Sequence, residues 1–249
     1  MCYGDDARPP LPPVRGGADD RGDMTLSASD GTELMAYYAH PDGPSDKGMI
    51  VLPDVRGLHH FYKELAVRFA EAGFHAVAID YFSRTADNDD RGEDFPFMDH
   101  VAQMKPETTD LDIAAAAGWL RGLPGSPVRD VFSVGFCMGG ALSWRQSASG
   151  LGLAGCIGFY GMPARVEDRV PDMQSPLLLL AAGKDFTPVE AVEEFATQVR
   201  DRGVEARLHV YPDAPHSFFD RGFAEHAEAC DDAWRQILDF TGSASASGA

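Results

Sequence analysis

The sequence predicts an α/β protein with a mainly parallel central sheet and helices on both of its faces. Short, almost continuously apolar runs alternate with amphipathic segments, which is typical of parallel strands buried on both sides. The runs expected as strands are 48–52, 75–79, 131–136, 155–160, 177–182 and 206–211. The segments expected as helices are about 61–72, 107–122, 139–148, 188–202 and 224–240. The alternating segment 24–38, interrupted by the turn residues Asp30 and Gly31, is expected as an antiparallel edge hairpin.

Length and composition predict how the chain is divided. With 249 residues, of which 44% are hydrophobic, the chain is long enough for one large core and short for two. Residues 1–22 are rich in Pro, Gly, Asp and Arg without periodicity, and 241–249 are small and polar. We therefore expect a flexible N-terminal arm at 1–22, a single domain at 23–240 and a flexible C-terminal tail at 241–249.

Net charge and cysteine content limit which classes of partner and which cellular compartment are expected. The formal net charge of −18 argues against nucleic acid, which is bound by neutralising phosphates with Lys and Arg. No apolar segment approaches the ~20 residues of a membrane span, so no membrane partner is expected. Four irregularly spaced cysteines and the lack of an apolar signal-peptide core predict a reduced, cytoplasmic protein. We expect a monomer or homodimer.

The most informative segment is residues 131–140, an apolar run that ends in small residues around Cys137. A chain that turns sharply from a buried strand into a helix needs glycines on both sides of the turn, and the residue at the apex is held outward in a strained conformation. This is the nucleophile elbow pattern, with a cysteine where serine is commoner. Backbone N–H groups at a helix N-terminus favour the thiolate form, so Cys137 is the candidate nucleophile.

A thiol nucleophile needs a base, and the base needs an acid to orient it. After Cys137, the loops that follow strands offer Asp185 and His216 for these roles. The order nucleophile, acid, histidine is that of the α/β-hydrolase triad. Taken singly, Asp185 is also a candidate helix cap and His216 an ordinary loop histidine. An oxyanion would be bound by the backbone N–H groups of Met138 and Val55.

These segments resemble the dienelactone hydrolase family, the carboxymethylenebutenolidases of the α/β-hydrolase superfamily. The resemblance covers about residues 24–240 and is carried by four motifs: 135–140, Phe159-Tyr160-Gly161, Gly183-Lys184-Asp185 and 211–218. It implies the α/β-hydrolase fold, no cofactor, and attack of the elbow cysteine on an ester or lactone carbonyl. It also implies that an acid on the loop after the first parallel strand engages the thiol. In this sequence that acid is Asp54, which is one methylene shorter than the family glutamate.

The resemblance further implies two arginines that bind a substrate carboxylate, and here the sequence departs from the family pattern. Arg84 and Arg221 each lie one residue from the expected place, and Asp220 occupies one of those places. Arg56, beside the expected oxyanion loop, is a third candidate although it has no counterpart in the family pattern, and Tyr160 is a further expected substrate-binding residue. Aromatic residues, Phe186 among them, could wall an apolar pocket, although most are expected in the core. His59 and His60 lack a third ligand at a metal-site spacing, so no metal is expected.

The leading hypothesis is therefore a cofactor-independent cysteine hydrolase that acts through a thioacyl-enzyme on an ester or lactone bond of a small molecule. Whether that molecule also carries a carboxylate depends on the arginine candidates. A glutamine amidotransferase-like enzyme is an alternative, but such domains place an acid two residues after the histidine, where this chain has Phe218. A non-hydrolytic binding protein, or a thiol redox sensor on the same fold, is the other alternative.

Overall fold

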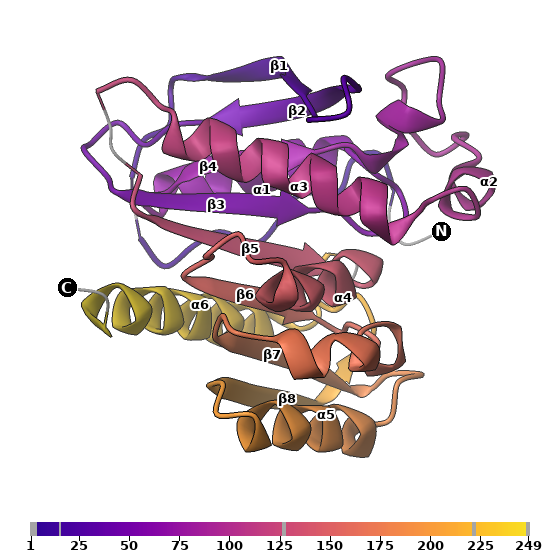
Figure 1. The fold of residues 1–249 in the computed structure, drawn as a ribbon, viewed down its shortest axis with the longest axis vertical. Coiled ribbons are helices and arrows are strands. Elements are labelled where there is room, and N and C mark those ends of the chain that lie inside the picture. Colours follow the sequence, from indigo (N-terminus) through magenta and orange to yellow (C-terminus); the bar gives the residue numbers. More distant parts are fainter. Residues whose placement is uncertain (1–3, 15, 126–127, 221–222, 248–249) are drawn as a thin grey trace. The chain divides into compact units, whose positions relative to one another are not determined.

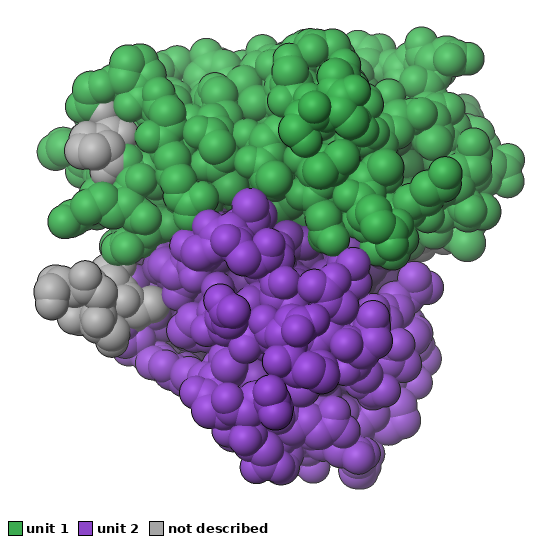
Figure 2. Space-filling model, in the orientation of Figure 1, with its two compact units in different colours: residues 1, 3–131 green, residues 2, 132–249 purple. Residues whose placement is uncertain are grey.

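The computed structural model describes residues 4–14, 16–125, 128–220 and 223–247. These residues form two compact units, unit 1 up to Val131 and unit 2 from Phe132 onward (Figure 2). Each unit has its own strands, helices and buried core, and each is described separately below. The single domain expected over 23–240 stays a prediction.

Unit 1 contains four strands in the order β1 (Arg21–Ser27), β2 (Glu33–Ala39), β4 (His75–Ile79) and β3 (Lys47–Leu52) (Figure 1). The β1–β2 and β2–β4 pairs are antiparallel, whereas β3 and β4 are parallel. The antiparallel pair predicted at the N-terminus is therefore confirmed. All five residues of β4 are buried, as expected for a strand that is covered on both faces.

The helices of unit 1 are α1 (His60–Glu71), α2 (Phe97–Val101) and α3 (Pro106–Arg121), with a 3-10 turn, η1, at Tyr81–Arg84. His59 caps α1, because its ring Nδ1 accepts a hydrogen bond of 3.2 Å from the backbone N–H of Phe61. Pro106 is the first residue of α3, where a proline costs no helical hydrogen bond. Both long helices bury one apolar face and leave a polar face in solvent.

Unit 2 contains four parallel strands in the order β5 (Asp130–Phe136, of which it holds the part from Phe132 onward), β6 (Gly155–Phe159), β7 (Leu177–Lys184) and β8 (Ala206–Pro215). Its long helices are α4 (Met138–Arg145), α5 (Val189–Asp201) and α6 (Ala227–Ser247), and Figure 1 shows α6 on the face of these strands opposite to α4 and α5. The described residues of the unit also form three 3-10 turns: η2 (Gln146–Ala148), η3 (Pro163–Arg165) and η4 (Glu167–Asp172).

The last helix is longer than the sequence pattern indicated. Its apolar periodicity ends near residue 240, but α6 continues to Ser247. The added residues are mostly Ala and Ser, which continue an existing helix at low cost because each one adds a backbone hydrogen bond.

Part of the N-terminal segment packs against the strands and helices of unit 1. Pro9, Pro10 and Pro12 are buried, and Ala18 belongs to an apolar cluster with residues of β2 and α1. Prolines lose little conformational entropy when they are ordered, so a short aperiodic segment can still be held against the fold.

None of the helices among the described residues is both long and apolar enough to cross a membrane.

Candidate active site

Cys137 lies at a strained turn between β5 and α4 in unit 2. Its backbone has φ 54° and ψ −113°, a region that residues with a side chain rarely adopt. A Cβ on Gly135 would lie 1.8 Å from the carbonyl oxygen of Gly139, and one on Gly140 would lie 2.5 Å from that of Phe159. The small residues that flank the cysteine are therefore required by close backbone approach.

The backbone around Cys137 is anchored on both sides of the turn. Its N–H donates to the carbonyl of Phe159, at the end of β6, over 3.1 Å, and its own carbonyl accepts from the N–H of Gly140 over 3.0 Å. Met138 is the first residue of α4 and is 8% exposed. Its N–H therefore belongs to the first helical turn, in which N–H groups point out of the helix and favour negative charge.

The thiol of Cys137 differs from the other described thiols in its exposure. Cys137 is half-buried, whereas Cys156 and Cys230 are buried, and all three are reduced. Burial raises the pKa of both Cys156 and Cys230 to about 12. These two cysteines are therefore protonated near neutral pH, and Cys137 is the accessible thiol of this group.

Asp185 and His216 form a close pair in the same unit. His216 Nδ1 lies 2.9 Å from both carboxylate oxygens of Asp185. The Asp185 side chain is 2% exposed and that of His216 is 18% exposed, so the contact is shielded from water while the imidazole remains accessible. Asp185 does not cap the next helix, because the N-cap of α5 is Pro188.

The topology explains why these three residues lie at one edge of unit 2. Cys137 directly follows β5, Asp185 directly follows β7 and His216 directly follows β8. The four strands of the unit are parallel, so their carboxyl ends share one edge. This is the edge at which α/β proteins bind ligands.

Two aromatic rings contact the imidazole of His216. The Tyr160 ring centroid lies 4.9 Å from that of His216, and the Phe186 centroid lies 4.5 Å from it. Tyr160 has a positive φ of 37°, and its hydroxyl donates to the buried carboxylate of Asp220 over 3.2 Å. Phe186 is 65% exposed. These contacts hold Tyr160 and Phe186 beside the histidine, which sequence spacing alone did not show.

Asp54 and Val55 lie in unit 1, on the loop after β3. The side chain of Asp54 is fully buried, and its Oδ1 accepts a hydrogen bond of 2.9 Å from the backbone N–H of Arg56. The Tyr81 hydroxyl donates to the neighbouring carbonyl of Pro53 over 3.1 Å. Burial, and secondarily the nearby carboxylate of Asp54, raises the pKa of Tyr81 well above its usual value.

Arg56 is 1% exposed and is engaged by its own unit. Its Nη2 lies 3.3 Å from Asp5 Oδ1 and donates to the carbonyl of Arg91 over 3.2 Å. The Asp5 carboxylate also contacts His59 Nε2 at 2.9 Å. Burial is the largest influence on His59 and lowers the pKa of its ring to about 4, although Asp5 acts in the opposite direction.

In the structure, the side chain of Asp5 lies beside His59 and His60, for which the sequence pattern offered no third ligand. Potential ligand atoms of Asp5, His59 and His60 lie within 4.8 Å of one another. Two guanidinium groups adjoin them, since Arg56 contacts Asp5 and Arg8 Nη1 lies 2.8 Å from His60 Nε2. Positive charge on both sides opposes a metal cation, so we interpret the cluster as the polar contact that holds the N-terminal segment. Sequence spacing missed it because Asp5 is remote in the chain.

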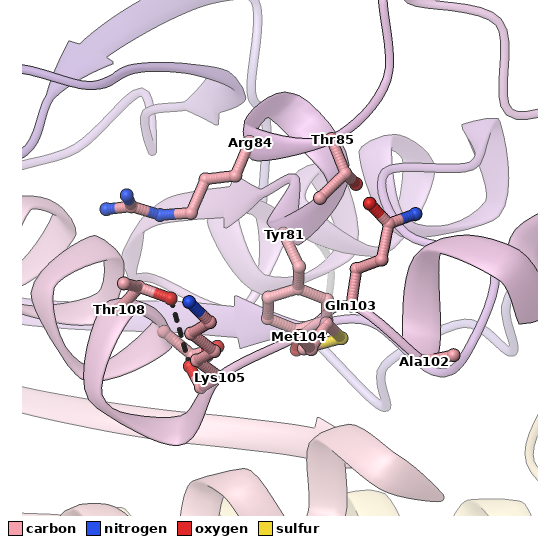
Figure 3. A pocket seen from close by; sticks show the side chains of 9 residues that line it. Tyr81, Arg84, Thr85, Ala102, Gln103, Met104, Lys105 and Thr108 are labelled. Atoms are coloured by element: carbon pink, nitrogen blue, oxygen red, sulfur yellow. Dashed lines mark hydrogen bonds between the residues drawn. The ribbon is translucent and has the colours of Figure 1, made fainter.

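Arg84 lines a cavity of about 540 Å³ in unit 1 (Figure 3). Its guanidinium is already engaged by side chains that do not line this cavity. Its Nε and Nη2 donate to the buried carboxylate of Asp112 over 3.0 and 2.6 Å. Its Nη1 donates to Asp30 over 2.8 Å and to Thr32 over 2.9 Å, and Nη2 also reaches Asp30. Arg84 lowers the pKa of Asp30 to about 2. The other residues that line the cavity are Tyr81, Thr85, Ala102, Gln103, Met104, Lys105, Thr108 and Thr109.

Arg221, the remaining arginine candidate, lies outside the described residues. Its neighbour Asp220 is 1% exposed. The contact of Asp220 with Tyr160 joins two segments that lie 60 residues apart, so no sequence pattern indicated it.

Comparison with known proteins shows similarity to the dienelactone hydrolase family. The family model described as "Dienelactone hydrolase family" matches residues 34–245. A "Putative carboxymethylenebutenolidase" from Yersinia pestis is 30% identical over 231 residues, which cover 87% of this chain and 86% of the relative. A protein of the same name from Escherichia coli K12 is 29% identical and covers 87% and 85% of the two chains.

Solved structures agree with this placement at the level of the fold. The crystal structure of a "Putative Dienelactone Hydrolase" from Klebsiella pneumoniae superposes with a TM-score of 0.75 at 24% identity, over 89% of this chain and 98% of that one. A dienelactone hydrolase-like promiscuous phosphotriesterase from metagenomic libraries gives a TM-score of 0.73 at 22% identity, over 91% and 99%. The predicted α/β-hydrolase fold is thereby confirmed.

Proposed function

The chain belongs to the dienelactone hydrolase family, and from this premise we propose that it hydrolyses an ester or lactone with the thiol of Cys137 as nucleophile. Family membership makes the protein a carboxylic ester or lactone hydrolase that acts on a small molecule. The identity of the nucleophile and the thioacyl intermediate are the proposed steps.

One observation carries the proposal: the contact between Asp185 and His216 at the edge of unit 2 where Cys137 follows β5. A carboxylate on Nδ1 keeps the proton on that nitrogen, so Nε2 carries the lone pair that can accept a proton. The same carboxylate stabilises the imidazolium once it forms. Asp185 is well suited to this role because its side chain is almost fully buried.

In the proposed first step, the Cys137 sulfur attacks the substrate carbonyl and its proton passes to His216 Nε2. The carbonyl oxygen becomes an oxyanion, and the N–H of Met138 donates to it from the first turn of α4. The tetrahedral intermediate then collapses, the carbon–oxygen bond breaks and His216 gives its proton to the leaving alkoxide. The products of this step are an alcohol and a thioester on Cys137.

In the second step, water hydrolyses the thioester. His216 accepts a proton from the water as its oxygen attacks, and the proton returns to the sulfur when the carbon–sulfur bond breaks. A carboxylic acid leaves and the thiol is restored. In a lactone the alcohol and the acid are parts of one molecule, so both leave together at this stage.

The proposal assigns no step to the other candidate residues. The predicted roles of the Asp54 carboxylate and the Val55 N–H stay predictions, as does substrate contact by Arg56, Arg221 and Tyr160. We give Arg84 no contact with a substrate carboxylate, because Asp112, Asp30 and Thr32 already accept from all three of its nitrogens. A carboxylate on the substrate is therefore not part of the proposal.

The test is hydrolysis of a panel of small esters and lactones by the wild-type protein, Cys137→Ala and Cys230→Ala. We expect Cys137→Ala to lose detectable activity while it keeps its fold by circular dichroism. Cys230→Ala removes a buried thiol and serves as the matched control, with activity retained wherever the variant folds. Unchanged activity in Cys137→Ala would reject the thiol mechanism. A mass increase on Cys137 equal to the acyl group less one hydrogen, after rapid quenching, would support it directly.

The acid of the pair is tested by Asp185→Asn. An amide cannot hold Nδ1 in the protonated form as a carboxylate does, so kcat should fall by roughly 10² to 10⁴ with little change in KM. Asp213→Asn is the matched control, because Asp213 is 92% exposed and pairs with Lys184 at the surface. Equal kcat values for Asp185→Asn and the wild-type protein would remove Asp185 from the mechanism.

A further inference from the structure

Phe186 is a large apolar residue whose side chain is mostly exposed to solvent. It is 65% exposed and directly follows Asp185, whose side chain is buried. A single exposed aromatic residue is ordinary on a protein surface, so exposure alone indicates nothing. The second observation is its contact with His216, in which the two ring centroids lie 4.5 Å apart with an interplanar angle of 36°. The exposed phenyl ring therefore adjoins the imidazole to which the proposed function assigns proton transfer.

We propose that Phe186 is a specificity-determining residue that binds the alcohol part of the substrate, and that this part is neutral and apolar. The inference rests on the proposed function, since it uses His216 as the group that protonates the leaving alkoxide. It adds the chemical class of the group that leaves and the residue that selects it.

Phe186 is assigned to the alcohol part because His216 must give its proton to the leaving alkoxide. His216 can protonate the alkoxide only if the leaving oxygen comes within hydrogen-bond reach of Nε2, about 3 Å. The carbon group attached to that oxygen must then lie beside the imidazole, where Phe186 already is. The acyl part stays bonded to Cys137 during this step, so its binding does not depend on a contact beside the histidine.

The side chains near His216 indicate that the alcohol part of the substrate is apolar and neutral. Phe186 and Tyr160 both present rings to His216, and an apolar group placed against an exposed ring gains free energy from the water it displaces. The nearby carboxylates are buried, with Asp185 bonded to His216 and Asp220 accepting from Tyr160. Their negative charge disfavours an anionic alcohol part. Lys184, the adjacent cation, pairs with Asp213 at 3.0 Å.

The experiment compares two ester series in the wild-type protein, Phe186→Ala, Phe186→Tyr and Leu11→Ala. One series is the acetates of methanol, butanol, hexanol and benzyl alcohol, and the other is the methyl esters of acetic, butyric and hexanoic acids. We expect Phe186→Ala to lower kcat/KM about tenfold for hexyl and benzyl acetate, mainly through KM, with less than about twofold change for methyl acetate and the acyl series. Phe186→Tyr retains the ring and should restore the preference. Leu11→Ala truncates a surface side chain that is 67% exposed and should match the wild type.

The possible results distinguish a failure of this inference from a failure of the proposed function. An equal fall in kcat/KM across both series would show that Phe186 only positions His216, and no change in either series would remove it from substrate binding. A change confined to the acyl series, or to the oligomeric state by light scattering, would equally overturn the assignment. If the wild type hydrolyses none of the esters, or Cys137→Ala retains full activity, the proposed function fails and the inference fails with it.

Discussion

At the scale of single residues, burial sets the chemistry of each cysteine that the structure describes. Cys137 is held outward by its backbone conformation, with φ 54°, and stays half-buried. Cys156 lies within β6 and Cys230 within α6, where each acts as a small apolar side chain. The same residue type therefore serves packing at two positions and faces solvent at a third.

Alkylation should reveal this difference. In the native protein, iodoacetamide at pH 7.5 should modify Cys137 much faster than Cys156 or Cys230, because burial raises the pKa of the latter two to about 12 and blocks access. Peptide mapping by mass spectrometry measures each site separately. In urea the three rates should converge. Equal modification of all three sites in the folded protein would contradict the assignment of Cys137 as the accessible thiol.

At the scale of elements, the β5–α4 turn determines the position of the nucleophile. The strand, the turn and the helix are packed closely, because a Cβ on Gly135 would overlap the backbone of Gly139 and one on Gly140 would overlap that of Phe159. The turn is strained, and the hydrogen bonds that its backbone makes with β6 and within α4 hold it in place.

Two glycine substitutions test this dependence. Gly135→Ala would place a methyl group 1.8 Å from a backbone oxygen, and backbone cannot move aside cheaply. We expect it to lower the free energy of unfolding by at least about 3 kcal/mol, measured by urea denaturation. Gly118→Ala, on the exposed face of α3 with open space around it, should instead raise that free energy by about 0.5–1 kcal/mol. Equal effects of the two substitutions would show that the turn tolerates a side chain.

At the scale of the whole molecule, acidic residues outnumber basic ones 39 to 21, and charges that become buried need local partners. In unit 1, Arg91 pairs with Asp80 at 2.8 Å and Arg84 pairs with Asp112 at 2.6 Å, with both carboxylates buried. In unit 2, Asp185 and Asp220 contact His216 and Tyr160. Buried carboxylates therefore belong to defined contacts and do not contribute to the solvent-exposed acidic surface.

His59 predicts how acid changes stability. Its pKa is about 4 in the folded protein, against 6.5 for an exposed histidine, so the unfolded chain binds a proton first. Stability is therefore lost as the pH falls below 6.5, and the full loss is reached below 4. His59→Asn keeps a side chain that can cap α1 but cannot take up this proton. Between pH 8 and pH 5, the wild type should lose about 2 kcal/mol more than the variant in urea denaturation. Parallel stability profiles of the two proteins would contradict the role of His59.

The sequence predicted the strands, the longer helices and the order of the candidate site residues, because these leave local patterns. The short helix α2 was not predicted. Apolar runs marked the six strands β3 to β8, and small residues around Cys137 marked the turn. Arg84 shows where local patterns fail, because its partners Asp30 and Asp112 are distant in sequence and only the fold brings them together. The same holds for the N-terminal segment, since the contacts of Asp5 with His59 and Arg56 depend on folding.

The sequence by itself determined the strand and helix pattern, the family, and the candidates Cys137, Asp185 and His216, since each depends on residues that are adjacent in the chain or at fixed strand ends. Only the tertiary structure decided which polar groups meet: the pairing of Asp185 with His216, the saturation of Arg84 and the placement of Phe186 against the imidazole. The physical reason is that hydrogen bonds and ring contacts act over a few ångströms, and such distances between remote residues are set by packing of the folded chain.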